Sequence, residues 1–298
     1  MKPLVSIIIL NYMTYELTIK CYDLLKEQIY DNMQVIIVDN ASPNSSSKVL
    51  KDHCKSKGIL FLESTENGGY AKGNNIGIKK ALELGSKYIF IMNNDIKLPE
   101  RNYLTKVVEY FESNPNVGLM GPVIYTNGIK GMALMNERPN WKHEMLTNFI
   151  RIPLWLVGKW HKKINLDQGN QINTIHNVTH TSQEVRNVYA VSGCCMFFTG
   201  ACLKEIEGFD EGTFLYNEEV IIGEKCFRKK IPVVYDTNFY ILHEHGATIK
   251  KHVQMRKQCI FEETSRMYYY KKYREDIPKW GYILLIISSK FNRHINIP

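Results

Sequence analysis

This 298-residue sequence lacks an apolar run long enough for export or membrane insertion. The run at residues 4–10 is too short for a signal peptide or a membrane span, and the run at residues 281–287 is also too short to cross a bilayer. The sequence therefore predicts a cytoplasmic protein.

Cysteine pairs are also missing. The seven cysteines are odd in number and form no Cys-x-x-Cys pair, which argues against a disulfide framework and a cysteine-based zinc site. We expect reduced, mostly buried thiols. The sequence contains no nucleic-acid recognition motif either, although its formal net charge of +8 would attract a polyanion. Its hydrophobic content of 44% is typical of a globular protein, so we expect a folded enzyme or binding domain without a nucleic-acid partner.

Much of the positive charge lies late in the chain, between residues 250 and 274, among the tyrosines at 268–270 and 273. The basic residues there are Lys250, Lys251, Arg256, Lys257, Arg266, Lys271, Lys272 and Arg274. This pattern predicts a basic, aromatic surface helix, and the stretch from Lys250 to Trp280 could rest on anionic headgroups as a peripheral membrane contact. The alternative is a pair of helices that packs on the core or on a second subunit, which would give a homodimer.

The hydrophobic pattern alternates between strands and helices. The β-branched run at residues 4–10 is typical of a strand buried on both faces, and apolar residues then follow at helical spacing over 14–28. Further strands are predicted at 34–38, 59–62, 88–92 and 117–122, with helices from 43, over 70–84 and over 102–113. This alternation predicts an α/β fold with a mostly parallel sheet flanked by helices. The pattern fades over 126–186, which we interpret as an insertion, and resumes at 188–199.

Polar residues follow several predicted strands, at the edge where open α/β sheets bind ligands. Asn11 and Asp39 end the first two strands, and Asn94 and Asp95 follow the strand at 88–92. Asp95 could hold Mn²⁺ or Mg²⁺, which take oxygen ligands and bridge phosphates. A turn is the alternative, because Asn and Asp are common at strand ends. Asp39 could accept a hydrogen bond from a base or a ribose, since Ser42 is the better cap for the next helix.

Residues 67–75 enter a helix with three glycines and one lysine, so the backbone there could approach a nucleotide closely. The segment has neither the glycine spacing of a dinucleotide-binding fingerprint nor the Gly-Lys-Ser/Thr ending of a P-loop. A plain glycine-rich helix entrance is the alternative explanation. The candidate ligand-binding residues in this segment are Gly69, Lys72, Asn74 and Asn75.

Two adjacent carboxylates, Glu218 and Glu219, stand at the predicted start of a helix. Acidic residues are common in a first helical turn, but the aromatic residues at 209, 214 and 216 would raise a carboxylate pKa and favour a general base. His243 follows the apolar strand at 239–242 and could join Asp95 at a metal site. A lone histidine after a strand is, however, more often a packing or surface residue.

Together these segments resemble the family 2 nucleotide-sugar glycosyltransferases, especially the rhamnosyltransferase-like bacterial branch of capsule and O-antigen synthesis. The resemblance implies the GT-A fold and covers residues 3–95 and 187–248. Asn93-Asn94-Asp95 stands where the family has its DxD metal motif, so Asp95 and His243 are expected to bind Mn²⁺ or Mg²⁺. The nucleotide sugar is expected to contact Asn11, Asp39, Gly69, Lys72, Asn74, Asn75, Asn94 and Asp95.

The segment 208–219 resembles the family's stretch that ends in Glu-Asp, whose last residue is the catalytic base. Here that residue is Glu219, and Glu218 stays a candidate because glutamate is one methylene longer than aspartate. Ile221 and Lys225 depart from the Asp and Arg of many relatives. The resemblance implies inverting transfer of rhamnose or another hexose from a UDP- or dTDP-linked donor to a lipid-linked oligosaccharide. A sugar-1-phosphate nucleotidyltransferase and a non-catalytic nucleotide-sugar-binding protein are the alternatives.

The resemblance also divides the chain into four parts. Residues 1–125 are expected to form the nucleotide-sugar-binding half, and residues 187–249 the acceptor-binding and catalytic half of the same domain. Residues 126–186 are the insertion, assigned to the acceptor side. Residues 250–298 are expected to form a basic, aromatic helical extension.

Overall fold

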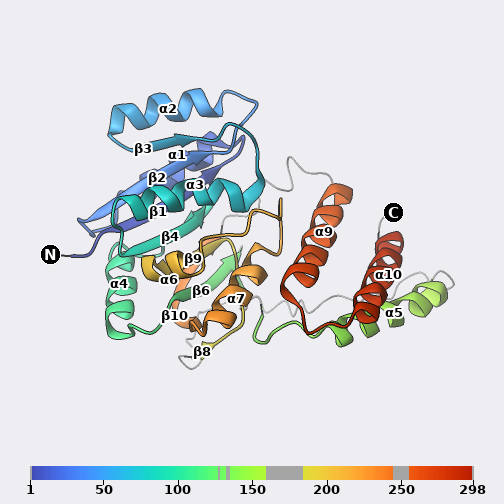
Figure 1. The fold of residues 1–298 in the computed structure, drawn as a ribbon. Helices are drawn as coiled ribbons and strands as arrows, with labels where there is room; N and C mark the ends of the chain where they lie inside the picture. Colours follow the sequence, from blue (N-terminus) through green and yellow to red (C-terminus); the bar gives the residue numbers. More distant parts are fainter. Residues whose placement is uncertain (1, 127, 132–134, 159–183, 244–254, 297–298) are drawn as a thin grey trace.

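The computed structural model describes residues 2–126, 128–131, 135–158, 184–243 and 255–296. Within these residues a single sheet has the strand order β3-β2-β1-β4-β9-β6-β10-β5, with β7 paired to β6 and β8 paired to β10. Figure 1 shows the sheet flanked by helices, with α5, α9 and α10 gathered at the end of the molecule away from the N-terminus.

The first half of the chain builds the parallel part of the sheet. Its strands are β1 (Val5–Asn11), β2 (Met33–Asp39), β3 (Leu60–Glu63) and β4 (Tyr88–Asn93), and its helices are α1 (Tyr15–Leu25), α2 (Ser46–Lys57), α3 (Gly69–Glu83) and α4 (Tyr103–Ser113). Alternate residues of β1 enter two different cores: Ile7 and Ile9 pack with α1, α2 and α4, while Ile8 packs with α3. This double burial explains why β1 is a continuous apolar run.

The second half adds strands of both directions. They are β5 (Ile96–Lys97), β6 (Leu119–Thr126), β7 (Ile129–Lys130), β8 (Val185–Asn187), β9 (Cys195–Thr199) and β10 (Val233–His243). Strand β9 lies antiparallel between β4 and β6, whereas β10 runs parallel to β6. Helices α6 (Gly200–Glu205) and α7 (Glu218–Lys229) join α3 on one face. The predicted α/β fold with a mostly parallel, helix-flanked sheet is confirmed, and β9 is the main reversal within it.

The predicted insertion contains a helix that the sequence pattern did not reveal. Helix α5 (Trp141–Gly158) packs against α10 (Lys279–Asn296), and the rings of Trp141 and Trp280 meet edge to face at 5.7 Å. Trp141 of α5 is buried against a partner helix more than 100 residues away, so a local pattern says little about this helix. The rest of the predicted insertion, residues 159–183, lies outside the described residues.

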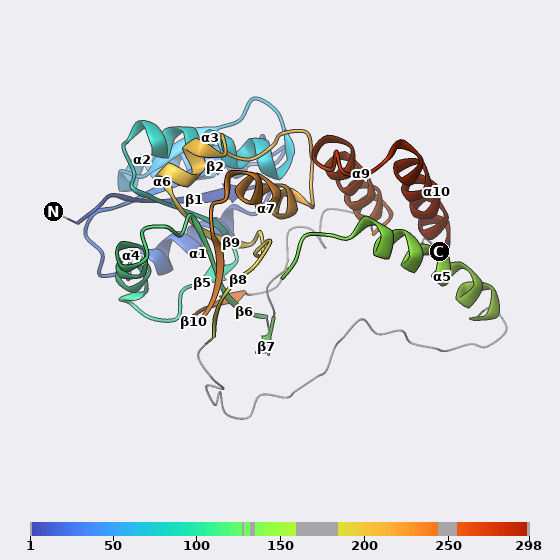
Figure 2. The ribbon, with the colours of Figure 1, turned by 60° about the horizontal axis from the view of Figure 1, so that its bottom comes forward.

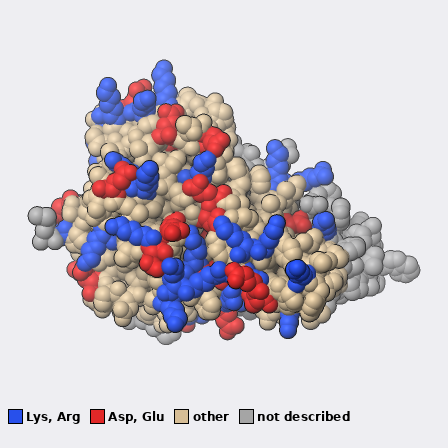
Figure 3. Space-filling model, viewed as in Figure 1, with Lys and Arg blue, Asp and Glu red and all other residues tan. Residues whose placement is uncertain are grey.

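The predicted basic, aromatic surface helix corresponds to α9 (Met255–Tyr273), whose lysines and Arg256 are exposed, but three of its four tyrosines are buried. Tyr269 and Tyr270 are buried in a core cluster with α7 and α10, and Tyr273 is buried as well. Arg266 pairs with Glu144 at 3.1 Å, and Lys272 pairs with Asp210 at 2.7 Å. Figure 3 shows Lys and Arg interspersed with Asp and Glu on the face it presents. Lys250 and Lys251 lie outside the described residues.

A buried carboxylate on α7 ties the C-terminal helices to the sheet. Glu224 has no exposed surface and accepts two hydrogen bonds from Arg138, at 2.8 and 2.6 Å. Arg228 donates to it at 2.9 Å and Tyr189 at 2.8 Å, and the Tyr189 hydroxyl also lies 2.8 Å from that of Tyr269 on α9. One carboxylate therefore joins α7, α9 and the segment before α5.

We expect Glu224→Gln to lower the free energy of unfolding by about 1–3 kcal/mol, because two arginines lose a buried counter-charge but stay partly exposed to water. Urea unfolding followed by tryptophan fluorescence measures this, since three of the four tryptophans, Trp141, Trp155 and Trp280, belong to α5 or α10. The control is Glu205→Gln, which removes the exposed pair with Lys229. Equal stability of the two variants would contradict the role given to Glu224.

Candidate active site

Three chain segments meet at the carboxyl ends of the parallel strands. The Tyr70 amide at the start of α3 donates to the Phe214 carbonyl at 2.9 Å, and the Tyr70 hydroxyl donates to the Gly193 carbonyl at 2.6 Å. The Asn93 amide at the end of β4 donates to the Cys194 carbonyl at 2.9 Å. These bonds join the glycine-rich turn, the loop before β9 and the loop before α7. Figure 2 shows α9 beside this end of the sheet.

The structure places Asp95 and His243 together. Strand β5 pairs with β10 so that Ile96 lies opposite His243, which brings the imidazole Nε2 to 3.2 Å from the Asp95 Oδ1 atom. The side chains are 4% exposed for Asp95 and 17% exposed for His243. Neither atom is aligned for a hydrogen bond, so both are buried without a partner. A divalent cation between them would satisfy both lone pairs.

Asn11 and Asp39 belong to one buried network. Asn11 donates to the Asp39 Oδ1 atom at 2.7 Å and accepts from Thr18 at 2.8 Å. Ser42 donates to the same Asp39 oxygen at 2.8 Å, and its amide donates to the other at 2.9 Å. The expectation that Ser42 caps the next helix is wrong, because α2 begins only at Ser46. Both carboxylate oxygens of Asp39 therefore accept hydrogen bonds within the protein, and they hold the loop that follows β2.

Asn94 extends this network toward Asp95 and His243. Its amide donates to Thr14 at 2.9 Å and to Thr18 at 3.0 Å. Asn94 is the residue before Asp95 and is itself buried. Its contacts to α1 therefore fix the backbone from which the Asp95 carboxylate projects.

The glycine-rich turn packs tightly against the loop before α7. Gly69 has a φ of +85°, and a Cβ there would lie 2.1 Å from the Phe214 carbonyl oxygen. Only glycine fits both this conformation and this contact. Lys72 points to Glu66 at 2.5 Å, and Asn75 exchanges hydrogen bonds with the backbone of Phe209.

Asn74 and Asn40 each keep one buried amide oxygen without a partner. Asn74 donates to the Tyr70 carbonyl at 3.0 Å, whereas Asn40 donates to Gly69 and Asn67, also at 3.0 Å. Their Oδ1 atoms accept no hydrogen bond among the described residues. Asn40 was not among the residues predicted to bind a ligand, although it directly follows Asp39, which was. The structure adds it because of its contacts to the glycine-rich turn.

The two carboxylates open α7 after a strained turn. Tyr216 and Asn217 have φ values of 71° and 64°, which is unusual for a bulky residue such as tyrosine. Glu218 is buried and its Oε1 atom has no hydrogen-bond partner. Glu219 lies next to Gly193, since a Cβ on that glycine would be 3.7 Å from the Glu219 Oε2 atom.

Burial sets the protonation of this pair. It raises the pKa of Glu218 to about 8, with a further increase from the neighbouring charge of Glu219. Burial also raises the pKa of Glu219 above its ordinary value. Burial raises the pKa of the nearby Cys194 thiol to about 11, with smaller contributions from the charges of Asp95 and Glu219. Gly193, which lies beside Glu219, directly precedes Cys194, and the Cys194 carbonyl accepts the amide of Asn93, two residues before Asp95. These contacts bring the segment that carries Asp95 close to the segment that carries Glu219.

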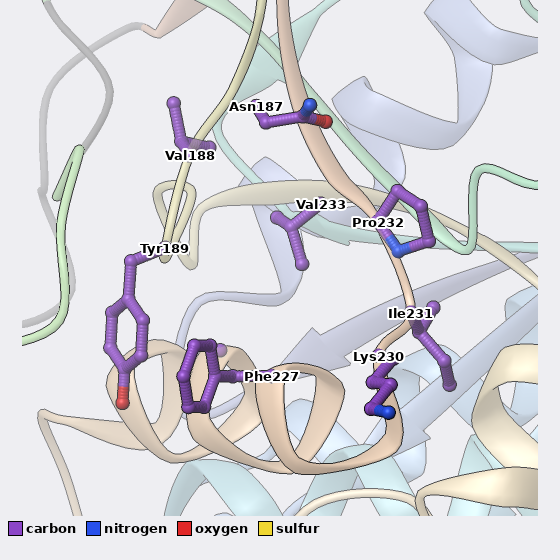
Figure 4. Close-up of a pocket in the computed structure, with 9 residues that line it drawn as sticks. Asn187, Val188, Tyr189, Phe227, Lys230, Ile231, Pro232 and Val233 are labelled. Atoms are coloured by element: carbon purple, nitrogen blue, oxygen red, sulfur yellow. The ribbon is translucent and has the colours of Figure 1, made fainter.

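A separate cleft of about 350 Å³ lies at the other end of α7 (Figure 4). Its walls are Asn187, Val188, Tyr189, Gly223, Phe227, Lys230, Ile231, Pro232 and Val233. Helix α7 spans 12 residues, so its two ends are about 18 Å apart. The cleft is therefore distinct from the site built on Asp95, Glu219 and His243.

The protein-family model described as Glycosyl transferase family 2 matches residues 6–178. The low-salt glycan biosynthesis hexosyltransferase Agl10 of Haloferax volcanii is 25% identical over 227 residues, which are 76% of this chain and 61% of that protein. The dTDP-rhamnosyl transferase RfbF of Shigella flexneri is 34% identical over 99 residues, 33% of this chain and 31% of that protein. The chain thus spans less than two thirds of the length of either relative.

A solved structure of the mannosyltransferase PcManGT from Pyrobaculum calidifontis, in complex with GDP-Man and Mn²⁺, aligns with a TM-score of 0.60 at 15% identity. The alignment covers 99% of this chain and 71% of that chain, which shows a shared fold. The GT-A fold expected from the resemblance is confirmed. Because the family model covers more than half of the sequence, the chain belongs to glycosyl transferase family 2.

Proposed function

We propose that the protein transfers a hexose from a nucleoside diphosphate sugar to a hydroxyl of a glycan acceptor, with inversion at the anomeric carbon. The observation that carries this proposal is the single site formed by Asp95, His243 and Glu219. Two buried ligand atoms without hydrogen-bond partners and the partly exposed Glu219 carboxylate belong to segments that meet at the ligand-binding edge of the sheet. Family membership supports the same reaction class.

Asp95 and His243 fit a divalent metal, Mn²⁺ or Mg²⁺. Their facing atoms are buried, unpaired and of the oxygen and imidazole types that such ions accept. Among the described residues, no group of three or more His, Cys, Asp or Glu side chains forms a closed metal cage. Two protein ligands leave room for diphosphate oxygens and water, as is usual for a metal bound with a phosphate substrate. When bound, the ion would neutralise charge on the departing diphosphate.

Glu219 is the proposed general base. Its carboxylate takes the proton of the acceptor hydroxyl while the hydroxyl oxygen bonds to the anomeric carbon. The bond between that carbon and the phosphate oxygen breaks, and the nucleoside diphosphate leaves with the electron pair. Glu218, with a pKa of about 8, is mostly protonated at neutral pH, so Glu219 is the proposed charged member of the pair. This favours Glu219 over its neighbour as the base.

The Asn40 and Asn74 oxygens and the turn at Gly69 are proposed to contact the nucleotide. Asp39 and Asn11 would then act mainly by holding that surface in place, because their polar atoms already bind each other. Lys72 and Asn75 are also proposed contacts, although Lys72 would have to leave Glu66 to reach a phosphate. Asn94 would support Asp95.

The donor is proposed to carry rhamnose or another hexose on UDP or dTDP. RfbF, by its name, uses a dTDP-linked rhamnose, whereas PcManGT was solved with GDP-Man, so all three nucleotides belong in the test. The proposed acceptor is a lipid-linked oligosaccharide of a capsule or another surface polysaccharide. A nucleotidyltransferase fits less well, because β1 ends at Asn11 and is followed by Tyr-Met-Thr, whereas those enzymes have a glycine-rich loop after the first strand. A non-catalytic sugar-nucleotide binder would have no use for the Glu218–Glu219 pair.

We expect calorimetric titration with UDP, dTDP and GDP to show that one of them binds more tightly when Mn²⁺ is present. Asp95→Asn should abolish this gain, because an amide oxygen is a weaker ligand than a carboxylate. His243→Gln should reduce it. The matched control is Asp31→Asn, which changes an exposed aspartate that pairs with Lys2. A metal-dependent gain that survives in Asp95→Asn would contradict the assignment.

Glu219→Gln should lower kcat by about 10² to 10⁴-fold, the usual contribution of a general base. Glu218→Gln should keep most activity at pH 7, since glutamine resembles the protonated acid that burial favours at this position. Steady-state kinetics of the two variants with one donor separate these roles. A severe loss in Glu218→Gln together with a mild one in Glu219→Gln would assign the base to Glu218.

The activity should fall as the pH is lowered toward the raised pKa of Glu219, because the base must be ionised to accept a proton. The midpoint of this acid limb in kcat/KM should lie above 4.5, the ordinary value for glutamate. The Glu218→Gln variant should retain the acid limb of kcat/KM. Any further change of kcat/KM near pH 8 in the wild type should be absent from this variant, because Glu218 no longer titrates. A wild-type profile that is flat from pH 5 to about pH 9 would refute a titrating carboxylate base.

A further inference from the structure

Helix α10 exposes an apolar stripe. Trp280, Ile283 and Ile287 lie at positions i, i+3 and i+7 of the helix, which places them on one face. They are 59%, 55% and 39% exposed. Leu146 on the neighbouring helix α5 is 56% exposed. Among the described residues, few large apolar side chains are as exposed as these. Trp280, Ile283 and Ile287 lie at helical spacing on a single helix and therefore form one surface.

The opposite side of α10 is buried. Leu285 has no exposed surface and joins the core cluster of Tyr269 and Trp141, and Ser288 and Ser289 are also buried. Arg266 on α9 donates to Ser289 at 3.1 Å. The packing therefore fixes α10 with its stripe outward. Among the described residues, no helix is both long and apolar enough to cross a bilayer.

The charged residues on α10 itself are all basic, and the acidic Glu275 and Asp276 just before it pair with Arg228 and Arg274. Lys279 and Lys290 flank the stripe on α10 and are exposed, as is Lys142 on α5. The sequence of α10 contains no Asp or Glu. In a two-fold dimer built on this face, the same lysines would meet each other across the interface, which is unfavourable. An anionic surface would match both the apolar stripe and its basic rim.

We propose that this face, made of Trp280, Ile283 and Ile287 on α10 with Leu146 on α5, docks on an anionic lipid bilayer. The helix lies in the plane of the membrane, with the apolar side chains at the acyl boundary and the lysines at the headgroups. Trp280 suits this depth because its ring is large and apolar and its N–H can reach water. This face shares only Trp280 with the stretch from Lys250 to Trp280 that the sequence suggested as a membrane contact.

The docking face is linked to the catalytic helix by direct contacts. Helix α9 packs on both α10 and α7, and its Ser265 donates to the Leu215 carbonyl at 2.9 Å, in the loop that leads to Glu218. If α10 holds the protein on the bilayer, α9 connects this membrane contact to the loop that leads to Glu218 and Glu219. The use of a lipid-linked acceptor rests on the proposed function, but the docking itself does not.

The test is co-sedimentation of the full chain with vesicles of phosphatidylcholine and phosphatidylserine, compared with phosphatidylcholine alone. We expect binding to the anionic vesicles that weakens with added salt. The variant Trp280→Gln/Ile283→Gln/Ile287→Gln should lose at least about tenfold in partitioning, since three apolar side chains no longer enter the bilayer. The control Ile29→Gln/Ile129→Gln/Phe227→Gln removes three other exposed apolar side chains and should bind as the wild type does.

Circular dichroism and nucleotide titration of both triple variants check that the fold and the donor site are intact, independently of any transfer reaction. Absence of wild-type binding to anionic vesicles would overturn the proposal, and so would equal loss in the two triple variants. Light scattering that shows a dimer lost only in the α10 variant, with vesicle binding unchanged, would assign the face to a second copy of the chain. Failure of nucleotide binding alongside normal vesicle binding would contradict the proposed function and leave the docking face standing.

Discussion

The pairing of β9 with both β4 and β6 is the constraint on which the candidate site depends. Met92 lies opposite Cys195 in this register, so the loop just before β9 lies at the carboxyl end of β4. The Asn93 amide then bonds to the Cys194 carbonyl, and Gly193 lies next to Glu219. Phe90 and Phe197 pack across the two strands at 4.7 Å, which buries this junction in the core. The proposed metal ligand Asp95 and the proposed base Glu219 are thus supported by the same strand pairing.

The C-terminal helices hold the other side of the site. Asp210 accepts hydrogen bonds from Tyr268, Tyr273 and Lys272 of α9. Burial alone would raise the pKa of Asp210, but these donors lower it to about 2, so the carboxylate stays charged and bound. The strained turn at Tyr216 and Asn217 is held between this anchor and α7. Packing on α9 therefore supports a backbone conformation that the turn would not adopt alone.

The two adjacent glutamates have different environments. Glu218 is buried and its pKa is raised to about 8, whereas Glu219 is partly exposed and lies beside the Gly193 backbone. Burial raises the pKa of Glu219 as well. In other enzymes, a difference in environment separates two carboxylates into a neutral and a charged form. The Asp95 Oδ1 and His243 Nε2 atoms are buried without hydrogen-bond partners, which is the observation behind the proposed cation site.

The sequence by itself determined the parallel strands β1 to β4, their helices, and the positions of Asp95, Glu219 and His243 along the chain. Those features follow from local periodicity and from polar residues that end apolar strands. Tertiary structure alone decided the reversed direction of β9, the partner of α5, the burial of Tyr269 and Tyr270, and the use of Asp39 by Asn11 and Ser42. Each depends on contacts between residues far apart in sequence, where packing and burial outweigh local preference, so no local pattern could reveal them.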